Sequence, residues 1–115
     1  MVAIVRGTIR GIAKRYVDGT EAMEIWVPSD RAHGLPYTNG IRVPIILTIN
    51  GGRYTAGLRA TANNSYVWIC PNVKTMDDRP EKLAHVLASA GFKKNDKVFL
   101  VTDGNAIEMT AASSS

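Results

Sequence analysis

Hydrophobic and polar residues alternate most regularly between positions 41 and 61 of the chain. The odd positions of Ile41–Ile49 are all apolar, and this period of two predicts a half-buried strand. Asn50–Gly52 follows and favours a tight hairpin turn, because these residues tolerate positive backbone dihedrals. The return strand over residues 53–61 has its apolar residues at even positions, as a two-residue turn requires. Since Pro44 has no backbone N–H, we expect the first strand to lie at an edge near that residue.

Shorter apolar runs predict five further strands, at residues 2–12, 22–27, 66–70, 97–102 and 106–110. Asp103 and Gly104 join the last two strands as a second hairpin. One amphipathic helix is predicted to begin near Asp78, with Glu81 completing a capping box and Gly91 ending the helix. Its apolar stripe comprises Leu83, Val86, Leu87 and Ala90. A short helical turn is also predicted at residues 30–34, with Ser29 as its cap.

These elements predict a mainly β fold, a small open barrel or pseudobarrel of seven strands with one or two short helices. A β-sandwich is the alternative. An α/β nucleotide-binding fold is disfavoured because every parallel crossover needs a helix. We expect a single β-barrel domain over residues 1–110 and a disordered tail at residues 111–115.

The composition of the 115-residue chain is that of an ordinary globular domain, with 45% hydrophobic and 21% charged residues. Its single cysteine, Cys70, cannot form an internal disulfide, so a cytoplasmic location is expected. No apolar run approaches the roughly 20 residues that a membrane-spanning helix needs. The N-terminus also lacks the pattern of a signal peptide. We therefore expect no association with a membrane.

Charge is unevenly distributed along the chain, whose formal net charge is +4. Residues 31–76 include four arginines and one lysine but no aspartate or glutamate. Because the bias falls on predicted β-structure, it favours an acidic partner, and nucleic acid is the first candidate. The alternative is that mild basicity serves solubility alone.

The candidate DNA-binding residues are cationic, aromatic or hydrogen-bonding side chains on the predicted strands and their connections. Cations and hydroxyls suit phosphate contacts, whereas arginine and asparagine also suit base edges. The set is Arg10, Lys14, Arg15, Tyr16, Arg53, Arg59, Thr61, Asn63, Asn64 and Ser65. Asn63–Ser65 could instead serve only as turn formers. Trp26 and Trp68 lie in short apolar strands, which favours core packing over base stacking.

The sequence gives little support for catalysis, so we expect a protein that is not an enzyme and uses no cofactor or metal. His33 and His85 lie far apart in the sequence, and a structural or solvent-facing role is favoured for both. Cys70 ends an apolar strand and has no charged neighbour in sequence, which predicts a buried, inert thiol. Neither histidine has the spacing of a metal-ligand pair with Cys70 or with the other.

The order of the predicted elements resembles the DNA-binding pseudobarrel of plant auxin-response-type transcription factors. It is also similar to the effector domains of EcoRII-like restriction endonucleases. The similarity is carried by the runs IWVPSDRAHGLP, RVPIILTINGGRYTAGLRATANNSYVWICP and EKLAHVLASAGFKKNDKVFLVTDGNAIEM. The resemblance implies that two arms, here residues 13–20 and 59–66, grip the major groove of DNA. The aromatic-rich second arm of the plant proteins is replaced here by Ala60–Asn63.

A rival resemblance is to small bacterial β-barrel domains of unknown function. It is carried by Arg42 and Val43, by the Asn50–Gly51 turn, and by Asp96 and Val98. From the charge pattern and the first resemblance, we expect a non-catalytic domain that binds double-stranded DNA, as the recognition part of a restriction or regulatory system. The alternative is a β-barrel that binds another protein, a second copy of itself, or a small ligand.

Overall fold

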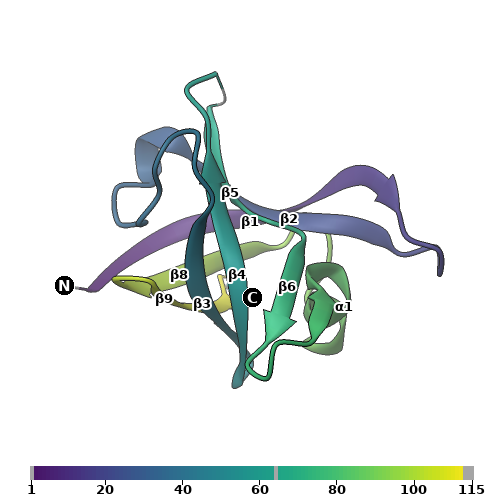
Figure 1. The fold of residues 1–115 in the computed structure, drawn as a ribbon. Coiled ribbons are helices and arrows are strands. Elements are labelled where there is room, and N and C mark those ends of the chain that lie inside the picture. The colour runs from purple at the N-terminus through teal and green to yellow at the C-terminus, as the bar shows by residue number, and fades with distance from the viewer. Residues whose placement is uncertain (1, 64, 113–115) are drawn as a thin grey trace.

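The computed structural model describes residues 2–63 and 65–112. Strands dominate these residues, and one α-helix and one 3₁₀ turn accompany them (Figure 1). The elements are β1 (Val2–Arg15), β2 (Glu21–Pro28), η1 (Ser29–Arg31), β3 (Val43–Ile49), β4 (Gly52–Ala60), β5 (Tyr66–Ile69), β6 (Asn72–Thr75), β7 (Pro80–Lys82), α1 (Leu83–Ser89), β8 (Lys97–Asp103) and β9 (Ala106–Ala111).

Seven of the strands form a barrel, in the order β3-β9-β8-β1-β2-β5-β4. Pairing between β3 and β4 closes the ring, and β6 and β7 extend the sheet beyond β4. The pairing is antiparallel throughout this sheet except between β3 and β9. The predicted mainly β, seven-stranded barrel is confirmed. Its ring, expected to be open, is closed by the hydrogen bonds between β3 and its two neighbours.

The β3–β4 hairpin forms in the predicted register, with Ile49 opposite Gly52. Asn50 and Gly51 occupy the turn with positive φ values of 51° and 83°. Pro44 lies opposite Gly57 of β4, whereas pairing with β9 begins only at Ile46. The strand is therefore an edge at Pro44, as predicted, because a proline cannot donate to a second neighbour.

Alternate residues of every barrel strand fill one apolar core, since successive side chains of a strand point to opposite faces. The largest fully buried side chains include those of Ile9, Ile25, Leu47, Leu58 and Leu100. Helix α1 lies beside β6, where it packs against β2 and β7 (Figure 1). Its buried residues are Leu83, Ala84, Val86 and Leu87, which confirms most of the predicted apolar stripe.

The predicted start of the helix is wrong. Asp78 lies in the turn between β6 and β7 with a φ of 70°, and α1 begins only at Leu83. Residues 80–82 pair with β6 instead, which places Glu81 opposite Val73. No side chain caps α1 at Lys82. The capping box therefore does not form, because the short hairpin of β6 and β7 takes the residues that would have made it. The predicted end at Gly91 is confirmed by its φ of 86°.

Other boundaries also differ from the predictions. The helical turn forms as η1, but Ser29 is its first residue and is not the cap, because Pro28 occupies the N-cap position. The disordered tail was predicted to begin at residue 111. Ala111 instead belongs to β9, and the backbone N–H of Ala112 donates a 3.0 Å hydrogen bond to the backbone oxygen of Lys97. Residues 113–115 lie outside the described residues. Within the described ranges, no helix is long and apolar enough to cross a membrane.

Candidate nucleic-acid interface

Five neighbouring strands, β8, β1, β2, β5 and β4, present a continuous outer surface. Because the other residues of these strands fill the core, the outward residues are fixed by the period of two. We call this surface the arginine–aromatic face. It comprises Arg6, Thr8, Arg10, Glu24, Trp26, Arg59, Tyr66, Trp68, Lys97 and Phe99.

The sheet register aligns one row of these residues across the face. Lys97 lies opposite Thr8, Thr8 opposite Trp26, Trp26 opposite Trp68, and Trp68 opposite Arg59. Neighbouring strands are about 4.8 Å apart, so three spacings separate Thr8 from Arg59 by about 14 Å. Lys97 is fixed at its margin by a 3.0 Å hydrogen bond to the hydroxyl of Thr8. Cations thus occupy both margins of the face, and aromatic rings lie between them.

The aromatic rings form a connected cluster. The rings of Trp26 and Tyr66 stack with centroids 3.9 Å apart and planes 13° apart, and the ring of Trp68 is tilted against Tyr66 at 5.6 Å. All three side chains are partly exposed. The prediction that both tryptophans pack in the core is therefore wrong, because their neighbours Ile25, Val27, Val67 and Ile69 take the inward positions.

Two arginines of β1 lie over aromatic rings. The guanidinium of Arg10 is 5.0 Å from the ring centroid of Trp26, and that of Arg6 is 5.9 Å from Phe99. Such contacts hold a guanidinium by its planar face and leave its N–H edge available to an anion. Arg6 and Arg10 are four positions apart on one strand, or about 13 Å. Strand β1 therefore presents two arginine side chains about 13 Å apart, each held against an aromatic ring.

Glu24 is the acidic member of the face. Its carboxylate accepts a 2.8 Å hydrogen bond from the indole nitrogen of Trp26. Burial raises the pKa of the Glu24 carboxyl above its ordinary value, and the hydrogen bond from Trp26 opposes this shift. Because Glu24 lies opposite Arg10, a negative charge sits beside this arginine.

The structure brings together only part of the predicted site. Arg10 and Arg59 belong to the arginine–aromatic face, and Thr61 lies beside Arg59 in a shallow depression at its edge. Arg53 lies opposite Thr48 near the β3–β4 turn. It is six residues from Arg59, about 20 Å along the strand. Arg53 is therefore not part of the face.

The predicted second arm is the connection between β4 and β5. Asn63 and Ser65 are exposed there, and the backbone oxygen of Ser65 accepts a 2.9 Å hydrogen bond from Ser29. That bond ties the connection to η1. Asn64 lies outside the described residues.

The predicted first arm is the tip of the β1–β2 hairpin. Lys14 and Arg15 are exposed, and Arg15 donates to the backbone oxygen of Gly19 at 2.8 Å. Tyr16 points toward helix α1, where its ring centroid is 6.0 Å from that of His85. Burial, and to a smaller extent the charge of Asp18, raises the pKa of Tyr16. Tyr16 therefore serves chiefly to anchor the hairpin, and the exposed cations Lys14 and Arg15 are the predicted residues of this arm that face a partner.

A second contact holds this hairpin against α1. Nε2 of His85 lies 2.9 Å from the carboxylate of Asp18, an ion pair when the histidine is protonated, although the alignment is not that of a good hydrogen bond. Hydrogen bonds from Thr20 are the main cause that lowers the pKa of Asp18, and His85 adds to them. The hairpin tip is thus tied to the body of the protein.

The two arms lie at opposite ends of β2. Arg15 pairs with Glu21 at one end, and Tyr66 pairs with Pro28 at the other. Seven residue steps separate these ends, roughly 23 Å. In Figure 1 the hairpin extends to the right and the β4–β5 connection projects upward. The arginine–aromatic face lies between the arms on the same strands.

The cysteine and the possible metal ligands were the remaining candidates for chemistry. Cys70 is buried, and burial raises the pKa of its thiol although Arg42 and Arg59 act in the opposite direction. Within residues 2–63 and 65–112, no group of three or more histidine, cysteine, aspartate or glutamate side chains is arranged to hold a metal ion. Comparison with protein families, with curated proteins and with solved structures gives no match.

Proposed function

We propose that this chain is a non-catalytic domain that binds double-stranded DNA across the arginine–aromatic face. The observation that carries the proposal is the row from Lys97 to Arg59, with cations at both ends and Trp26 and Trp68 between them. Four strand spacings, about 19 Å along the sheet, separate Lys97 from Arg59, so the row is long enough to span the major groove, which is roughly 12 Å wide. Each margin therefore faces one phosphate backbone, and the aromatic rings face the groove.

The positions of the two arms support the same orientation. The hairpin carries Lys14 and Arg15 at one end of the face, and the β4–β5 connection carries Asn63 and Ser65 at the other. Resemblance to the auxin-response-type and EcoRII-like pseudobarrels implies arms at these two connections. A place in a restriction or regulatory system, and a cytoplasmic location beside the DNA, follow from that resemblance and from the unpaired Cys70.

Salt dependence tests this proposal directly. Arg6, Arg10, Arg59 and Lys97 provide four cations on the face, so the affinity should fall with a log–log slope of about 3.6 at 0.9 per neutralised phosphate. Anisotropy of a labelled 20-base-pair duplex, titrated at four salt concentrations, measures the slope. Absence of binding at low salt, or a slope near zero, would refute the proposal.

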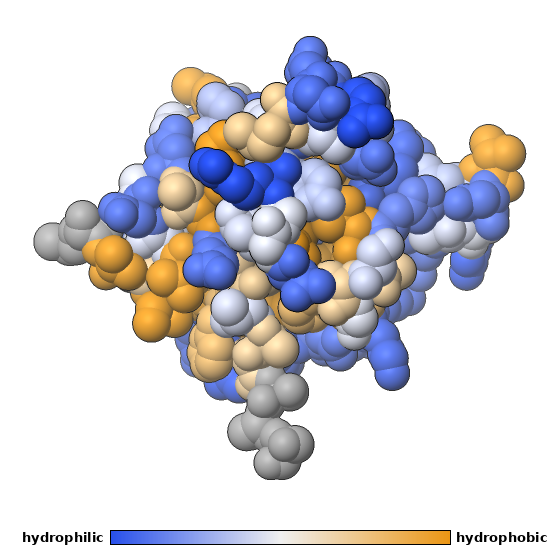
Figure 2. Space-filling model, turned by 90° about the horizontal axis from the view of Figure 1, so that it is seen from below, coloured by the Kyte–Doolittle hydropathy of each residue, from blue (hydrophilic) through white to orange (hydrophobic). Residues whose placement is uncertain are grey.

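An exposed apolar cluster favours a second candidate, association with a protein or with another copy of the chain. Val2 and Ile4 of β1 are 62% and 66% exposed, and Phe99 of the adjoining strand β8 is 36% exposed. Seen from below, hydrophobic residues form a group at the left margin, and others are spread over the rest of a mixed surface (Figure 2). Sedimentation equilibrium of the wild type and of Ile4→Ser tests this candidate, which fails if both are monomers at all concentrations.

A further inference from the structure

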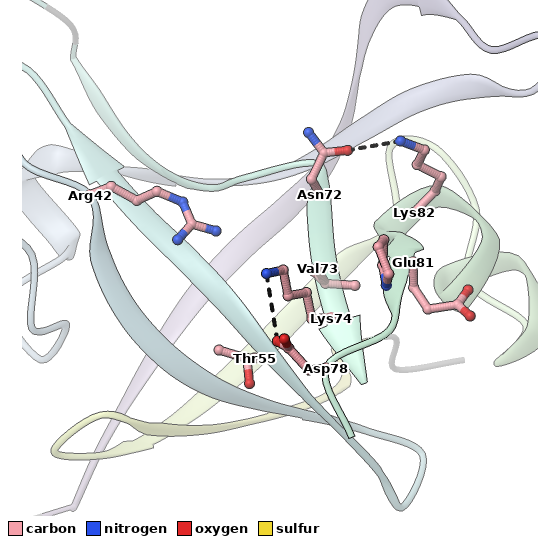
Figure 3. Close-up of a pocket in the computed structure, with 9 residues that line it drawn as sticks. Arg42, Thr55, Asn72, Val73, Lys74, Asp78, Glu81 and Lys82 are labelled. Carbon is pink, nitrogen blue, oxygen red and sulfur yellow. Dashed lines mark hydrogen bonds and ion pairs between the residues drawn. The ribbon is translucent and has the colours of Figure 1, made fainter. Parts of the chain in front are cut away.

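A groove opens where the sheet divides beside β4. Strand β5 leaves β4 after the pair Leu58 and Ile69, and β6 joins β4 only at Lys74 and Thr55. The chain between them turns away at Pro71 and leaves a groove of about 470 Å³. The side chains of Arg42, Thr55, Asn72, Lys74 and Lys82 surround it (Figure 3).

Arg42 enters this groove over a glycine. A Cβ atom at Gly57 would overlap the guanidinium of Arg42, so only a residue without a side chain allows this position. The guanidinium points into the gap between β4 and β6 (Figure 3). Arg42 takes part in none of the ion pairs formed within residues 2–63 and 65–112. Part of its donor edge is engaged by the thiol of Cys70, and the remaining N–H groups are available to a ligand.

Further donors surround the same space. The amide oxygen of Asn72 accepts a 3.2 Å hydrogen bond from Lys82, which leaves the amide N–H groups turned away from Lys82 (Figure 3). Lys74 is 3.5 Å from Asp78, but both side chains are more than half exposed, so this pair is weak. The carboxylate of Glu81 points away from the groove (Figure 3). The groove therefore holds the cations Arg42, Lys74 and Lys82 together with one carboxylate, that of Asp78, which lies beside Lys74 (Figure 3).

The groove continues into the arginine–aromatic face. Arg42 and Asn72 also line the shallow depression that contains Glu24, Arg59 and Trp68. A nucleic-acid strand that lies on the face and ends at this margin would place its terminal group near Arg42.

We propose that this groove binds a phosphate monoester, with the guanidinium of Arg42 as its principal contact and Asn72 and Lys74 as further donors. A guanidinium matches phosphate because its parallel N–H groups can bind two oxygens at once. The terminal phosphate of a DNA strand and a free phosphate share this chemistry. The assignment of the phosphate to a DNA end rests on the proposed function, whereas the phosphate site itself does not.

The first test uses inorganic phosphate, titrated into the protein by calorimetry. Arg42→Gln should weaken binding about tenfold or more, because it removes a charge-assisted pair. Gly57→Ala should weaken it similarly while all charges remain, since the added methyl displaces Arg42. Arg79→Gln, which removes an exposed arginine paired with Asp77, is the matched control and should bind as the wild type does. Equal thermal transitions would show that the variants fold.

The protonation state of the ligand gives a second readout. The second pKa of a phosphate monoester is about 6 and that of inorganic phosphate, the probe of the first test, is somewhat higher. The fraction of dianion therefore rises between pH 5.5 and pH 7.5 for both, and binding should be stronger at pH 7.5. Equal phosphate affinity in the wild type, Arg42→Gln and Gly57→Ala would overturn the proposal. Absence of phosphate binding would do the same. So would an adventitious ion only, that is, weak phosphate binding that sulfate displaces equally well at both pH values.

The second arm of the test compares duplexes with a 5′-phosphate and a 5′-hydroxyl. Tighter binding of the phosphorylated end, lost in Arg42→Gln, would assign the phosphate to DNA. If the end makes no difference while phosphate binding still depends on Arg42, the groove takes a free phosphate ester and the phosphate site stands. Salt-dependent duplex binding without any phosphate effect would overturn this site but leave the proposed function intact.

Discussion

Replacing Glu24 with glutamine tests whether the arginine–aromatic face binds DNA through its charge. Glu24 lies directly opposite Arg10 in the sheet, and its carboxylate accepts the hydrogen bond from Trp26. Glutamine keeps an oxygen in the same place to accept that bond, but it removes the negative charge. The variant therefore changes the electrostatics of the face and leaves its shape nearly unaltered.

The expected gain in affinity follows from Coulomb's law. Side chains opposite one another are about 5 Å apart at Cβ, so a phosphate bound to Arg10 would lie roughly 8 Å from the Glu24 carboxylate. The repulsion at that distance is about 0.5 kcal/mol in water and about 2 kcal/mol at an effective dielectric constant of 20. Glu24→Gln should therefore bind a duplex roughly 2- to 30-fold more tightly at pH 7.5.

The same experiment has a pH dependence of known sign. Because burial raises the pKa of Glu24, the wild-type carboxyl is protonated more readily than an exposed one as the pH falls. A bound phosphate raises that pKa further. The advantage of the variant should thus shrink between pH 7.5 and pH 5. Equal or weaker duplex binding by Glu24→Gln at pH 7.5 would refute the assignment of the face.

The stability of Glu24→Gln provides the control. A carboxyl whose pKa is raised on folding favours the folded state at low pH, and this contribution is lost as the pH rises through the folded-state pKa. The variant should therefore be at least as stable as the wild type at pH 7.5. A lower thermal transition would instead show that the charged carboxylate is structural.

Further predictions concern the cationic margins and the core. Arg10→Gln and Arg59→Gln should each reduce the salt slope of duplex binding by about 0.9, whereas Arg53→Gln should not; equal effects of all three in anisotropy titrations would place the DNA elsewhere. Leu100→Ala removes a fully buried side chain of β8 and should lower the free energy of unfolding by about 2–5 kcal/mol in urea denaturation. A loss below about 1 kcal/mol would contradict the packing described for this strand.

The sequence predicted the β3–β4 hairpin well because its signals are local. A period of two over Ile41–Ile49 and the Asn50–Gly51 turn determine the register without reference to the rest of the chain. The helix start could not be predicted in the same way. Asp78 and Glu81 carry a good capping pattern, but residues 80–82 form a hairpin with β6. Strand β6 in turn pairs with β4, about 20 residues earlier, and the local pattern does not contain that pairing.

The candidate site was only partly predictable for a related reason. Trp26 and Trp68 lie within unbroken apolar runs, so no alternation shows which side chains face outward. Only the pairing of β2 with β1 and β5 determines that both rings lie on the surface. Arg10 and Arg59 were found from charge, whereas Lys97 and Phe99 join them through pairing with a strand about 90 residues away.

Intrinsic fluorescence tests the central proposal most directly, because the chain has two tryptophans and both lie on the arginine–aromatic face. Titration with an unlabelled duplex should change the emission of Trp26→Phe and of Trp68→Phe. Each change should saturate with the same dissociation constant that anisotropy gives for that variant. Duplex binding by anisotropy with unchanged emission in both variants would show that DNA does not bind at this face.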